Sequence, residues 1–379
     1  MKNILTVIGA RPQIIKAAAV SRAIREGFST ELNEVILHTG QHYDEKMSNV
    51  FFNELEIPRP DHQLDVGSGS HGAQTAKMLS GIEEVLLKDK IDALLVYGDT
   101  NSTLAGALAA AKLHIPVVHV EAGLRSFNKS MPEEINRIAC DHASTLLFSP
   151  TTTGFDNLKN EGFSTKNEGV ISIDNPGVFH CGDVMYDNSL YFSEKASRTI
   201  QADAFQLTTD KFVLVTIHRP YNTDDIDRLK AILDDLAWLA NEEEIELVVP
   251  LHPRTKNRLM QESADHYNAF ASNPRIHVIE PVSFLEMIWL EKNCSLVVTD
   301  SGGVQKEAYF FKKPSVVIRT ETEWTELVAH GSAELSFETG EAMRRVFSTS
   351  LNKKFNEFPQ VFGDGKASSF ICEMITTHL

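Results

Sequence analysis

Short runs rich in β-branched residues alternate with longer helical patterns along the whole chain. The runs span residues 4–8, 34–38, 93–97, 115–120, 212–217, 245–251, 276–279, 296–299 and 316–318. Alternation of this kind is typical of parallel strands joined by helical crossovers, with helices on both faces of the sheet. The sequence therefore predicts an α/β fold built from doubly wound parallel sheets.

The chain is longer than one hydrophobic core normally serves. It has 379 residues, 42% of them hydrophobic, so it can bury two cores and we expect two domains. The stretch 165–176 contains Asn, Gly and Pro, and we place the boundary there, which gives domains of residues 1–175 and 176–363. We expect a helix in residues 364–379 to pack back on the first domain.

Charge and cysteine usage argue against several classes of protein. The formal net charge of −16 disfavours sequence-independent binding to nucleic acid, which needs a basic face. Cys140, Cys181, Cys294 and Cys372 are far apart and lack metal-ligand or redox spacing. We therefore expect reduced thiols, a cytoplasmic protein and no metal site.

Targeting and membrane signals are also missing from the sequence. The N-terminal apolar run is interrupted at residues 9–12, too soon for the core of a signal peptide. No apolar run approaches the ~20 residues that a membrane helix needs. We expect no contact with a membrane.

Carboxylates follow two consecutive predicted strands in the first half. Asp99 follows the run 93–97 and Glu121 follows the run 115–120. Open α/β sheets bind ligands at the carboxyl ends of their strands, so both are candidate catalytic residues. The alternatives are that Asp99 caps the next helix and that Glu121 pairs with Arg125.

A third carboxylate comes from the segment 131–137. Glu133 and Glu134 follow Pro132, in the first turn of a predicted helix. We take Glu133 as catalytic and Arg137 as a substrate-binding residue. The alternative is that one of the two glutamates stabilises the helix and pairs with Arg137.

Two turns could bind phosphate. The first follows the run 4–8, where a glycine permits a tight exit and Arg11 and Lys16 add positive charge near a helix N-terminus. In the second, Ser301, Gly302 and Gly303 can point backbone N–H groups at a diphosphate, and Glu307 could accept hydrogen bonds from ribose hydroxyls. An ordinary strand-to-helix turn and a plain cap at Ser301 are the respective alternatives.

Two His/Arg pairs emerge at predicted strand ends in the second half. His218 and Arg219 follow the run 212–217, and His252 and Arg254 follow the run 245–251. With the 301–303 turn they would form a cationic, amide-lined pocket for an anion. A single histidine can equally be structural.

Together these motifs resemble the non-hydrolysing UDP-N-acetylglucosamine 2-epimerases across nearly the full length. Matching segments lie at residues 9–16, 39–43, 98–100, 119–125, 132–137, 218–219, 251–253 and 300–303, with Glu307. The resemblance implies a GT-B fold, with two Rossmann-like domains facing a cleft, usually in a homodimer. It also implies a UDP-sugar substrate and no cofactor or metal.

Carried over position by position, the family's roles fall on residues already singled out. Its acid/base carboxylates correspond to Asp99, Glu121 and Glu133, and its catalytic histidine to His218. Its UDP ligands correspond to Arg11, His252, Ser301, Gly302, Gly303 and Glu307. The implied reaction is anti elimination of UDP to a 2-acetamidoglucal, followed by re-addition with the opposite configuration at C2, in surface-polysaccharide precursor synthesis.

Departures from the usual motifs point to one branch of the family. Residues 9–13, 41–43 and 322–324 are similar to the branch that epimerises UDP-2,3-diacetamido-2,3-dideoxyglucuronic acid, and Tyr221 stands where the family usually has Glu. Three other functions remain open at this point. They are a hydrolysing epimerase that releases N-acetylmannosamine and UDP, a retaining GT-B glycosyltransferase, and a nucleotide-sugar binding protein without turnover.

Overall fold

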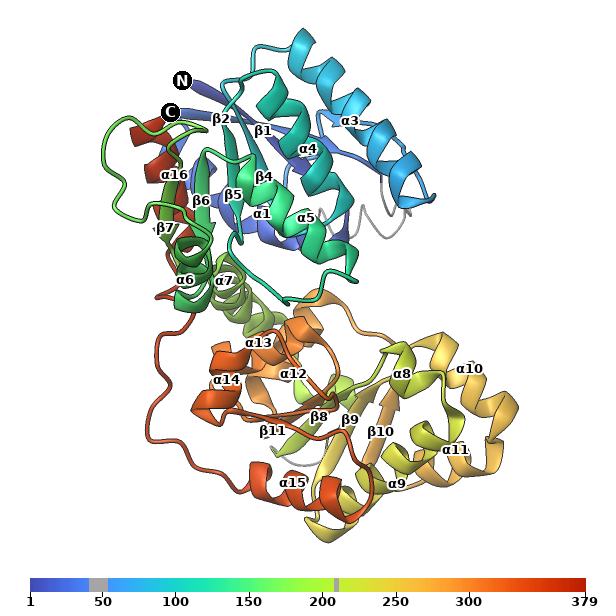
Figure 1. Cartoon of the computed structure of the whole chain (residues 1–379). Helices are drawn as coiled ribbons and strands as arrows, with labels where there is room; N and C mark the ends of the chain where they lie inside the picture. Colours follow the sequence, from blue (N-terminus) through green and yellow to red (C-terminus); the bar gives the residue numbers. More distant parts are fainter. Residues whose placement is uncertain (41–53, 208–210) are drawn as a thin grey trace. The chain divides into compact units, whose positions relative to one another are not determined.

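The computed structural model of the chain describes residues 1–40, 54–207 and 211–379 (Figure 1). They divide into two compact units. Unit 1 comprises Met1–Asn188 with Gln360–Leu379, and unit 2 comprises Ser189–Pro359. Residues 41–43 of the motif at 39–43 lie outside the described residues.

Unit 1 contains a seven-stranded sheet in which every paired strand runs parallel to its neighbour. Its strands are β1 (Lys2–Ile8), β2 (Leu32–His38), β3 (His62–Gln63), β4 (Ala93–Tyr97), β5 (Val117–Val120), β6 (Leu146–Ser149) and β7 (Gly177–His180). They lie in the order β3-β2-β1-β4-β5-β6-β7. Its helices are α1 (Arg11–Ala23), continued by a π-helical turn (Ile24–Phe28), α3 (His71–Lys88), α4 (Asn101–Lys112), α5 (Pro132–His142), α6 (Thr152–Asn160) and α16 (Ala367–His378).

Unit 2 contains a six-stranded parallel sheet of the same design. Its strands are β8 (Phe212–Thr216), β9 (Glu246–Pro250), β10 (Ile276–Ile279), β11 (Leu296–Thr299), β12 (Ser315–Val317) and β13 (Ala333–Leu335), in the order β10-β9-β8-β11-β12-β13. Its helices are α8 (Pro220–Thr223), α9 (Ile226–Glu242), α10 (Pro253–Glu262), α11 (Ala264–Ala271), α12 (Phe284–Asn293), α13 (Gly302–Phe310), α14 (Thr325–His330) and α15 (Glu341–Leu351), with a 3₁₀ turn at Ala202–Phe205. Helix α7 (Val184–Thr199) spans the division between the units.

Both sheets therefore have the Rossmann strand order, in which the direction of winding reverses beside the first strand. The reversal lies between β1 and β4 in unit 1 and between β8 and β11 in unit 2. Ligands of open α/β sheets bind outside the carboxyl ends of the strands at such a point. The prediction of two Rossmann-like parallel-sheet domains, as in the GT-B fold, is confirmed.

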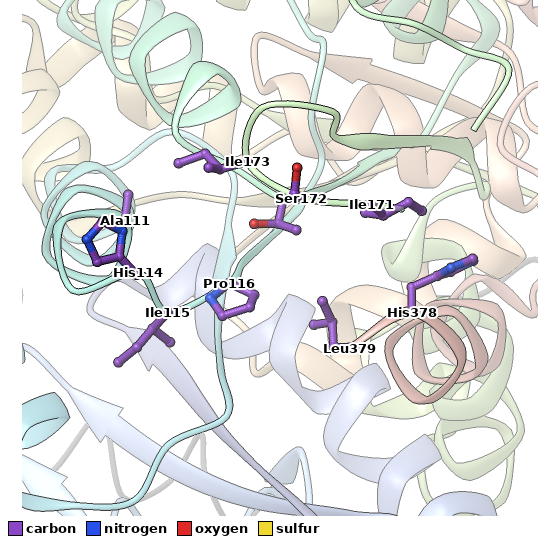
Figure 2. A pocket seen from close by; sticks show the side chains of 10 residues that line it. Ala111, His114, Ile115, Pro116, Ile171, Ser172, Ile173, His378 and Leu379 are labelled. Atoms are coloured by element: carbon purple, nitrogen blue, oxygen red, sulfur yellow. The ribbon is translucent and has the colours of Figure 1, made fainter. Parts of the chain in front are cut away.

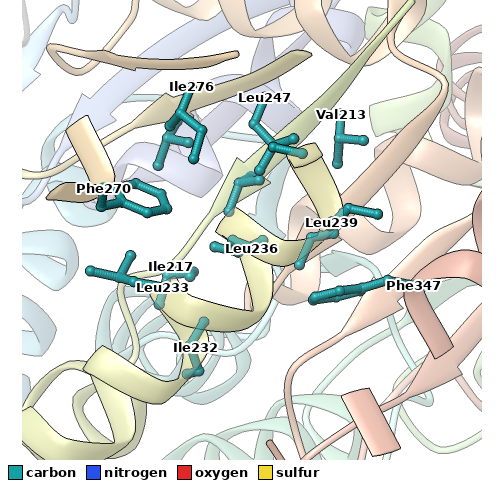
Figure 3. Close-up of a cluster of buried hydrophobic side chains, with 14 of the residues drawn as sticks. Val213, Ile217, Ile232, Leu233, Leu236, Leu239, Leu247, Phe270, Ile276 and Phe347 are labelled. Carbon is teal, nitrogen blue, oxygen red and sulfur yellow. The ribbon is translucent and has the colours of Figure 1, made fainter. Parts of the chain in front are cut away.

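Apolar side chains on the central strands explain the stability of each sheet. In unit 2 a buried cluster joins β8, β9 and α9, including Val213, Leu247 and Leu236, with Phe347 of α15 against it (Figure 3). In unit 1 all five residues of β4 are buried. Strands buried on both faces read as continuous apolar runs, which is why the sequence identifies them.

The predicted boundary between residues 175 and 176 differs from the division in the structure. Strand β7 pairs in parallel with β6, so it belongs to the sheet of unit 1. The Asn-, Gly- and Pro-containing stretch 165–176 is the connection that leads into this edge strand, not a linker between domains. Helix α16 lies in unit 1, where it contacts α1 and Lys2 Nζ donates to the carbonyl of Thr376 over 2.9 Å.

Candidate active site

The carboxyl edge of the unit 1 sheet brings together most of the residues predicted there. Asp99 follows β4 and Glu121 follows β5, and these strands are direct neighbours with Tyr97 opposite Val120. Arg11 is exposed in the first turn of α1, after β1. The candidate catalytic side chains of unit 1 thus lie close to the point where the winding of the sheet reverses.

Asp99 is held by the start of α5. Arg137 donates a hydrogen bond to its carboxylate, and Asn136 Nδ2 donates to its backbone carbonyl over 2.9 Å. The cap of α4 is Thr100, whose hydroxyl accepts from the N–H of Thr103. Asp99 is therefore not needed as a helix cap, and Arg137, predicted to bind substrate, contacts this carboxylate.

Glu121 has an unusual backbone conformation and an ionic partner. Its φ of +76° lies in the left-handed region, which non-glycine residues rarely adopt and which is common at functional sites. Lys16 donates a hydrogen bond to its carboxylate. The alternative partner, Arg125, binds Asp141 and Glu161 instead.

The structure separates the two neighbouring glutamates of α5. Glu134 is buried, and its carboxylate accepts from the backbone N–H groups of Ser126 and Phe127, both over 2.9 Å, and from Arg137 over 3.2 Å. Although burial raises the pKa of Glu134, these hydrogen bonds lower it below its ordinary value. Glu133 is exposed, and no hydrogen bond to its side chain is found in the described ranges. Glu134 shapes the loop, and Glu133 remains available to a ligand.

A buried network that the sequence did not reveal lies behind these carboxylates. His119 donates from Nδ1 to Asp141 over 2.7 Å and from Nε2 to the carbonyl of Gly98 over 2.8 Å. Both partners are acceptors. The carbonyl oxygen of Gly98 can only accept, and the Asp141 carboxylate also receives hydrogen bonds from Arg125 and from the N–H of Gly123. His119 must therefore carry both ring protons.

The pKa values of this network agree with that protonation. Burial alone would lower the pKa of His119, but the neighbouring Cys140 and Asp141 raise it well above its ordinary value. Burial raises the pKa of Asp141, but its hydrogen bonds to His119 and Arg125 lower it overall. The signal in the sequence was a histidine inside an apolar strand. Its partner, Asp141, is 22 positions away and is brought next to it only by the fold.

In unit 2, His218 is positioned by a residue that the prediction left without a role. Asp300 is fully buried and accepts from the backbone N–H of His218 over 3.1 Å and of Arg219 over 2.9 Å. The Nδ1 of His218 also lies 3.1 Å from Asp300, so the imidazole ring lies beside this buried carboxylate. The signal in the sequence was the position of Asp300 directly after the run 296–299.

The turn at residues 301–303 opens α13, and its serine does not act as a side-chain cap. Gly303 is exposed, and a Cβ there would lie 3.9 Å from Glu307 Oε2, so the glutamate is beside the turn. Trp324 Nε1 donates to the carbonyl of Gly302 over 2.9 Å. The N–H of Ser301 already donates to the hydroxyl of Thr299 over 3.0 Å, so the exposed Gly303, at the N-terminus of a nine-residue helix, is the residue of this turn best placed for a phosphate.

The other predicted residues of unit 2 are exposed at strand ends. Arg219 and His252 follow β8 and β9, and Nδ1 of His252 accepts from the N–H of Arg254 over 3.2 Å. Arg254 forms an exposed ion pair with Asp224 over 2.9 Å. The structure thus places Arg254 on a surface ion pair, which is a weak contact.

A hollow of about 350 Å³ lies at the opposite, amino edge of the unit 1 sheet, between β5, the loop at 171–173 and the end of α16 (Figure 2). None of the predicted site residues lines it. Across the described ranges there is no group of three or more His, Cys, Asp or Glu side chains that could hold a metal ion. No helix among the residues described is both long and apolar enough to cross a membrane.

The chain has two Rossmann-like units. In unit 1 carboxylates lie near the point where the winding of the sheet reverses, and in unit 2 a histidine and a glycine-containing turn lie near the corresponding point. This arrangement is typical of an enzyme with the GT-B fold. Comparison with known proteins agrees. The family model for UDP-N-acetylglucosamine 2-epimerase matches residues 26–376. The chain therefore belongs to the UDP-N-acetylglucosamine 2-epimerase family, and the predicted isomerase activity is confirmed at that level.

Individual relatives cover the chain from end to end. A UDP-2,3-diacetamido-2,3-dideoxy-D-glucuronate 2-epimerase of Pseudomonas aeruginosa is 49% identical over 98% of this chain and 99% of its own. The crystal structure of Methanocaldococcus jannaschii UDP-GlcNAc 2-epimerase in complex with UDP-GlcNAc and UDP is 41% identical, with a TM-score of 0.82 and all of both chains covered. The Neisseria meningitidis enzyme bound to UDP-GlcNAc is 30% identical over 99% of this chain and all of its own, with the same TM-score.

Proposed function

We propose that the protein inverts C2 of a UDP-2-acetamido sugar without net hydrolysis. The observation that carries the proposal is the pair of cation-bound carboxylates, Asp99 and Glu121, at the ends of two neighbouring strands. Departure of UDP from C1 leaves positive charge on the sugar, and nearby carboxylates stabilise such charge. A carboxylate can then remove the proton from C2.

The proposed reaction balances in two steps. In the first, the C1–O bond to UDP breaks and a carboxylate takes the C2 proton, which gives UDP and a 2-acetamidoglucal. In the second, a proton returns to C2 from the opposite face and UDP re-forms the C1–O bond. We assign the acid/base roles to Asp99, Glu121 and Glu133.

Unit 2 has the residues expected to hold the leaving group. We propose that the amides of residues 301–303, with Arg219 and His252, bind the diphosphate, and that His218 stabilises its charge as it departs. Arg11 is assigned as a further UDP ligand on the resemblance to the family alone. The exposed Gly303 at the start of α13 and the hydrogen bonds from the backbone N–H groups of His218 and Arg219 to Asp300 support these roles. General base catalysis typically contributes only about 10²–10⁴-fold, so stabilisation of UDP has to supply much of the rate.

For the sugar, we propose UDP-2,3-diacetamido-2,3-dideoxy-D-glucuronate, with UDP-N-acetylglucosamine as the alternative. The support is the 49% identity to the Pseudomonas aeruginosa relative of that name and the residues that depart from the usual motifs. In the structure one departure, Trp324, binds the carbonyl of Gly302 in the turn assigned to UDP. A change at residue 324 therefore bears directly on the proposed nucleotide site.

The test is incubation of each UDP sugar with the enzyme in deuterated water. Epimerisation by elimination predicts deuterium at C2 in both epimers and a stable total of UDP sugar, followed by NMR. Release of free N-acetylmannosamine from UDP-N-acetylglucosamine would establish the hydrolysing alternative. Exchange without any change in configuration, or no exchange with either sugar, would contradict the proposal.

We also propose that the enzyme is a homodimer that acts in the cytoplasm. The support for the compartment is that all four cysteines are free thiols, three of them buried. The dimer rests on the resemblance to the family. Light scattering during size-exclusion chromatography measures the mass directly, and a monomer at micromolar concentration would contradict the dimer.

A further inference from the structure

One buried acid in unit 2 has no part in the proposed mechanism. Glu291 lies on α12, which packs against α13, the helix opened by the 301–303 turn. Its side chain is fully buried, and neither carboxyl oxygen accepts a hydrogen bond within the part of the chain that the structure describes. An ionised carboxylate in such surroundings would be very costly.

The protonation of Glu291 follows from this environment. Burial raises the pKa of Glu291 well above its ordinary value, and the negative charge of Glu307 raises it further. The group therefore keeps its proton and has one O–H to donate. Its neighbour within hydrogen-bonding range is the side chain of Glu307.

Glu307 is therefore oriented from one side and exposed to ligand on the other. It is only half-buried, and its Oε2 is the oxygen that lies 3.9 Å from the Cβ position of Gly303. A carboxylate that accepts a hydrogen bond from an acid behind it keeps its remaining lone pairs for hydroxyl groups in front. A pair of vicinal hydroxyls, such as those of ribose, is suited to this geometry.

We propose that Glu291 is a positioning residue, a neutral carboxylic acid that fixes the Glu307 carboxylate for the two hydroxyls of the UDP ribose. This inference rests on the proposed role of Glu307 in binding UDP. It differs from a structural role in its consequences, because an apolar side chain of similar size would fill the same space at least as stably. On this proposal Glu291 contributes to nucleotide binding and not to folding.

The test compares Glu291→Met, which removes the donor, with Glu291→Gln, whose amide keeps one. Titration calorimetry measures the affinity of the full chain for UDP and for 2′-deoxy-UDP, which lacks one of the two hydroxyls. We expect Glu291→Met to weaken UDP binding roughly tenfold, as for loss of a charge-assisted hydrogen bond, and to weaken 2′-deoxy-UDP binding by a smaller factor, because only one hydroxyl contact to Glu307 remains there. Glu291→Gln should stay within about threefold of wild type, by the same argument.

Two other measurements separate the possible failures. The melting temperature of Glu291→Met should equal or exceed that of wild type. A lower melting temperature, together with an equal loss of affinity for UDP and for 2′-deoxy-UDP, would show a structural role and overturn the inference. Unchanged UDP affinity in Glu291→Met would overturn it too. If wild type binds UDP no more tightly than 2′-deoxy-UDP, Glu307 does not bind the ribose hydroxyls and the inference fails. The proposed reaction is tested separately, by deuterium exchange at C2.

Discussion

The ammonium group of Lys16 donates a hydrogen bond to the carboxylate of Glu121, across a space that Gly98 leaves open. A Cβ on Gly98 would lie 3.0 Å from Lys16 Nζ and 3.1 Å from Glu121 Oε2. Three segments that are far apart in the sequence thus meet at one carboxylate to which we assign an acid/base role. The strained backbone of Glu121 is maintained by this contact and by the strand ends around it.

Lys16→Met should slow the reaction without preventing folding. Hydrogen bonds to charged groups contribute about 1.5–3 kcal/mol, so we expect a fall in kcat of roughly 10–100-fold, with KM changed much less. Steady-state kinetics with the UDP sugar measures both. Lys112→Met, at an exposed residue of α4, is the matched control, and equal kinetics for the two variants would exclude a role for Lys16.

Gly98→Ala should affect the same contact through the backbone. The φ of Gly98 is +64°, a conformation that costs a non-glycine residue about 1–2 kcal/mol, and the added methyl crowds both Lys16 and Glu121. We expect lower stability and a lower kcat. Gly72→Ala, in α3 with open space around its Cβ position, is the control, and similar activity in both variants would contradict the argument.

Asp99→Asn and Glu133→Gln should each lower kcat by about two orders of magnitude or more, as expected for loss of an acid/base group. UDP affinity, measured by calorimetry, should stay near wild type because most of the proposed UDP ligands lie in unit 2. Near-normal turnover in both variants would remove the assigned carboxylates from the mechanism.

Glu134→Gln is the matched control for Glu133→Gln, at the adjacent position. An amide would place N–H groups against the N–H of Ser126 or Phe127, so we expect a loss of about 1–3 kcal/mol in stability. Denaturation in urea should thus separate the variants, with Glu134→Gln destabilised and Glu133→Gln near wild type. The reverse pattern would exchange the roles of the two glutamates.

The sequence was sufficient to predict the strands and the sheet edges that carry the site. Runs 93–97 and 296–299 coincide with β4 and β11, because central strands buried on both faces are continuously apolar. The run 276–279 coincides with the edge strand β10. Shorter edge strands such as β3 and β13 were not predicted, since two or three residues give no periodicity. The domain boundary was placed too early because the stretch 165–176 was taken for a linker, whereas it leads into the edge strand β7 of the unit 1 sheet.

Pairing between distant segments could not be predicted in the same way. Arg137 was expected to bind substrate, and Arg125 was the alternative partner of Glu121. Instead Arg137 binds Asp99, which is 38 positions away, and Glu121 binds Lys16, which is 105 positions away. Residues four apart are neighbours only on a helix, and the segment after Glu121 is not helical. Local spacing therefore predicted where the candidate residues lie in the sheet but not which residues they pair with.

The protonated ring of His119 should make the stability of unit 1, but not that of unit 2, depend on pH. Its folded pKa is raised above the ordinary value of 6.5, so the stabilisation by the protonated ring is fully present below that pH. As the pH rises toward the folded pKa, the unfolded chain loses the proton that the native state keeps. The free energy of unfolding of unit 1 should then fall by about 1.4 kcal/mol per pH unit on account of this one group.

His119→Gln should remove this slope and lower the stability at pH 6, because Gly98 and Asp141 lose a charged donor. Urea unfolding followed by hydrogen exchange and mass spectrometry scores the two units separately, with β8 of unit 2 as the internal control. Since the carbonyl of Gly98 directly precedes Asp99, we also expect kcat to fall while UDP affinity is kept. Parallel pH profiles for wild type and His119→Gln between pH 6.5 and 9 would show that the ring is neutral in the folded protein.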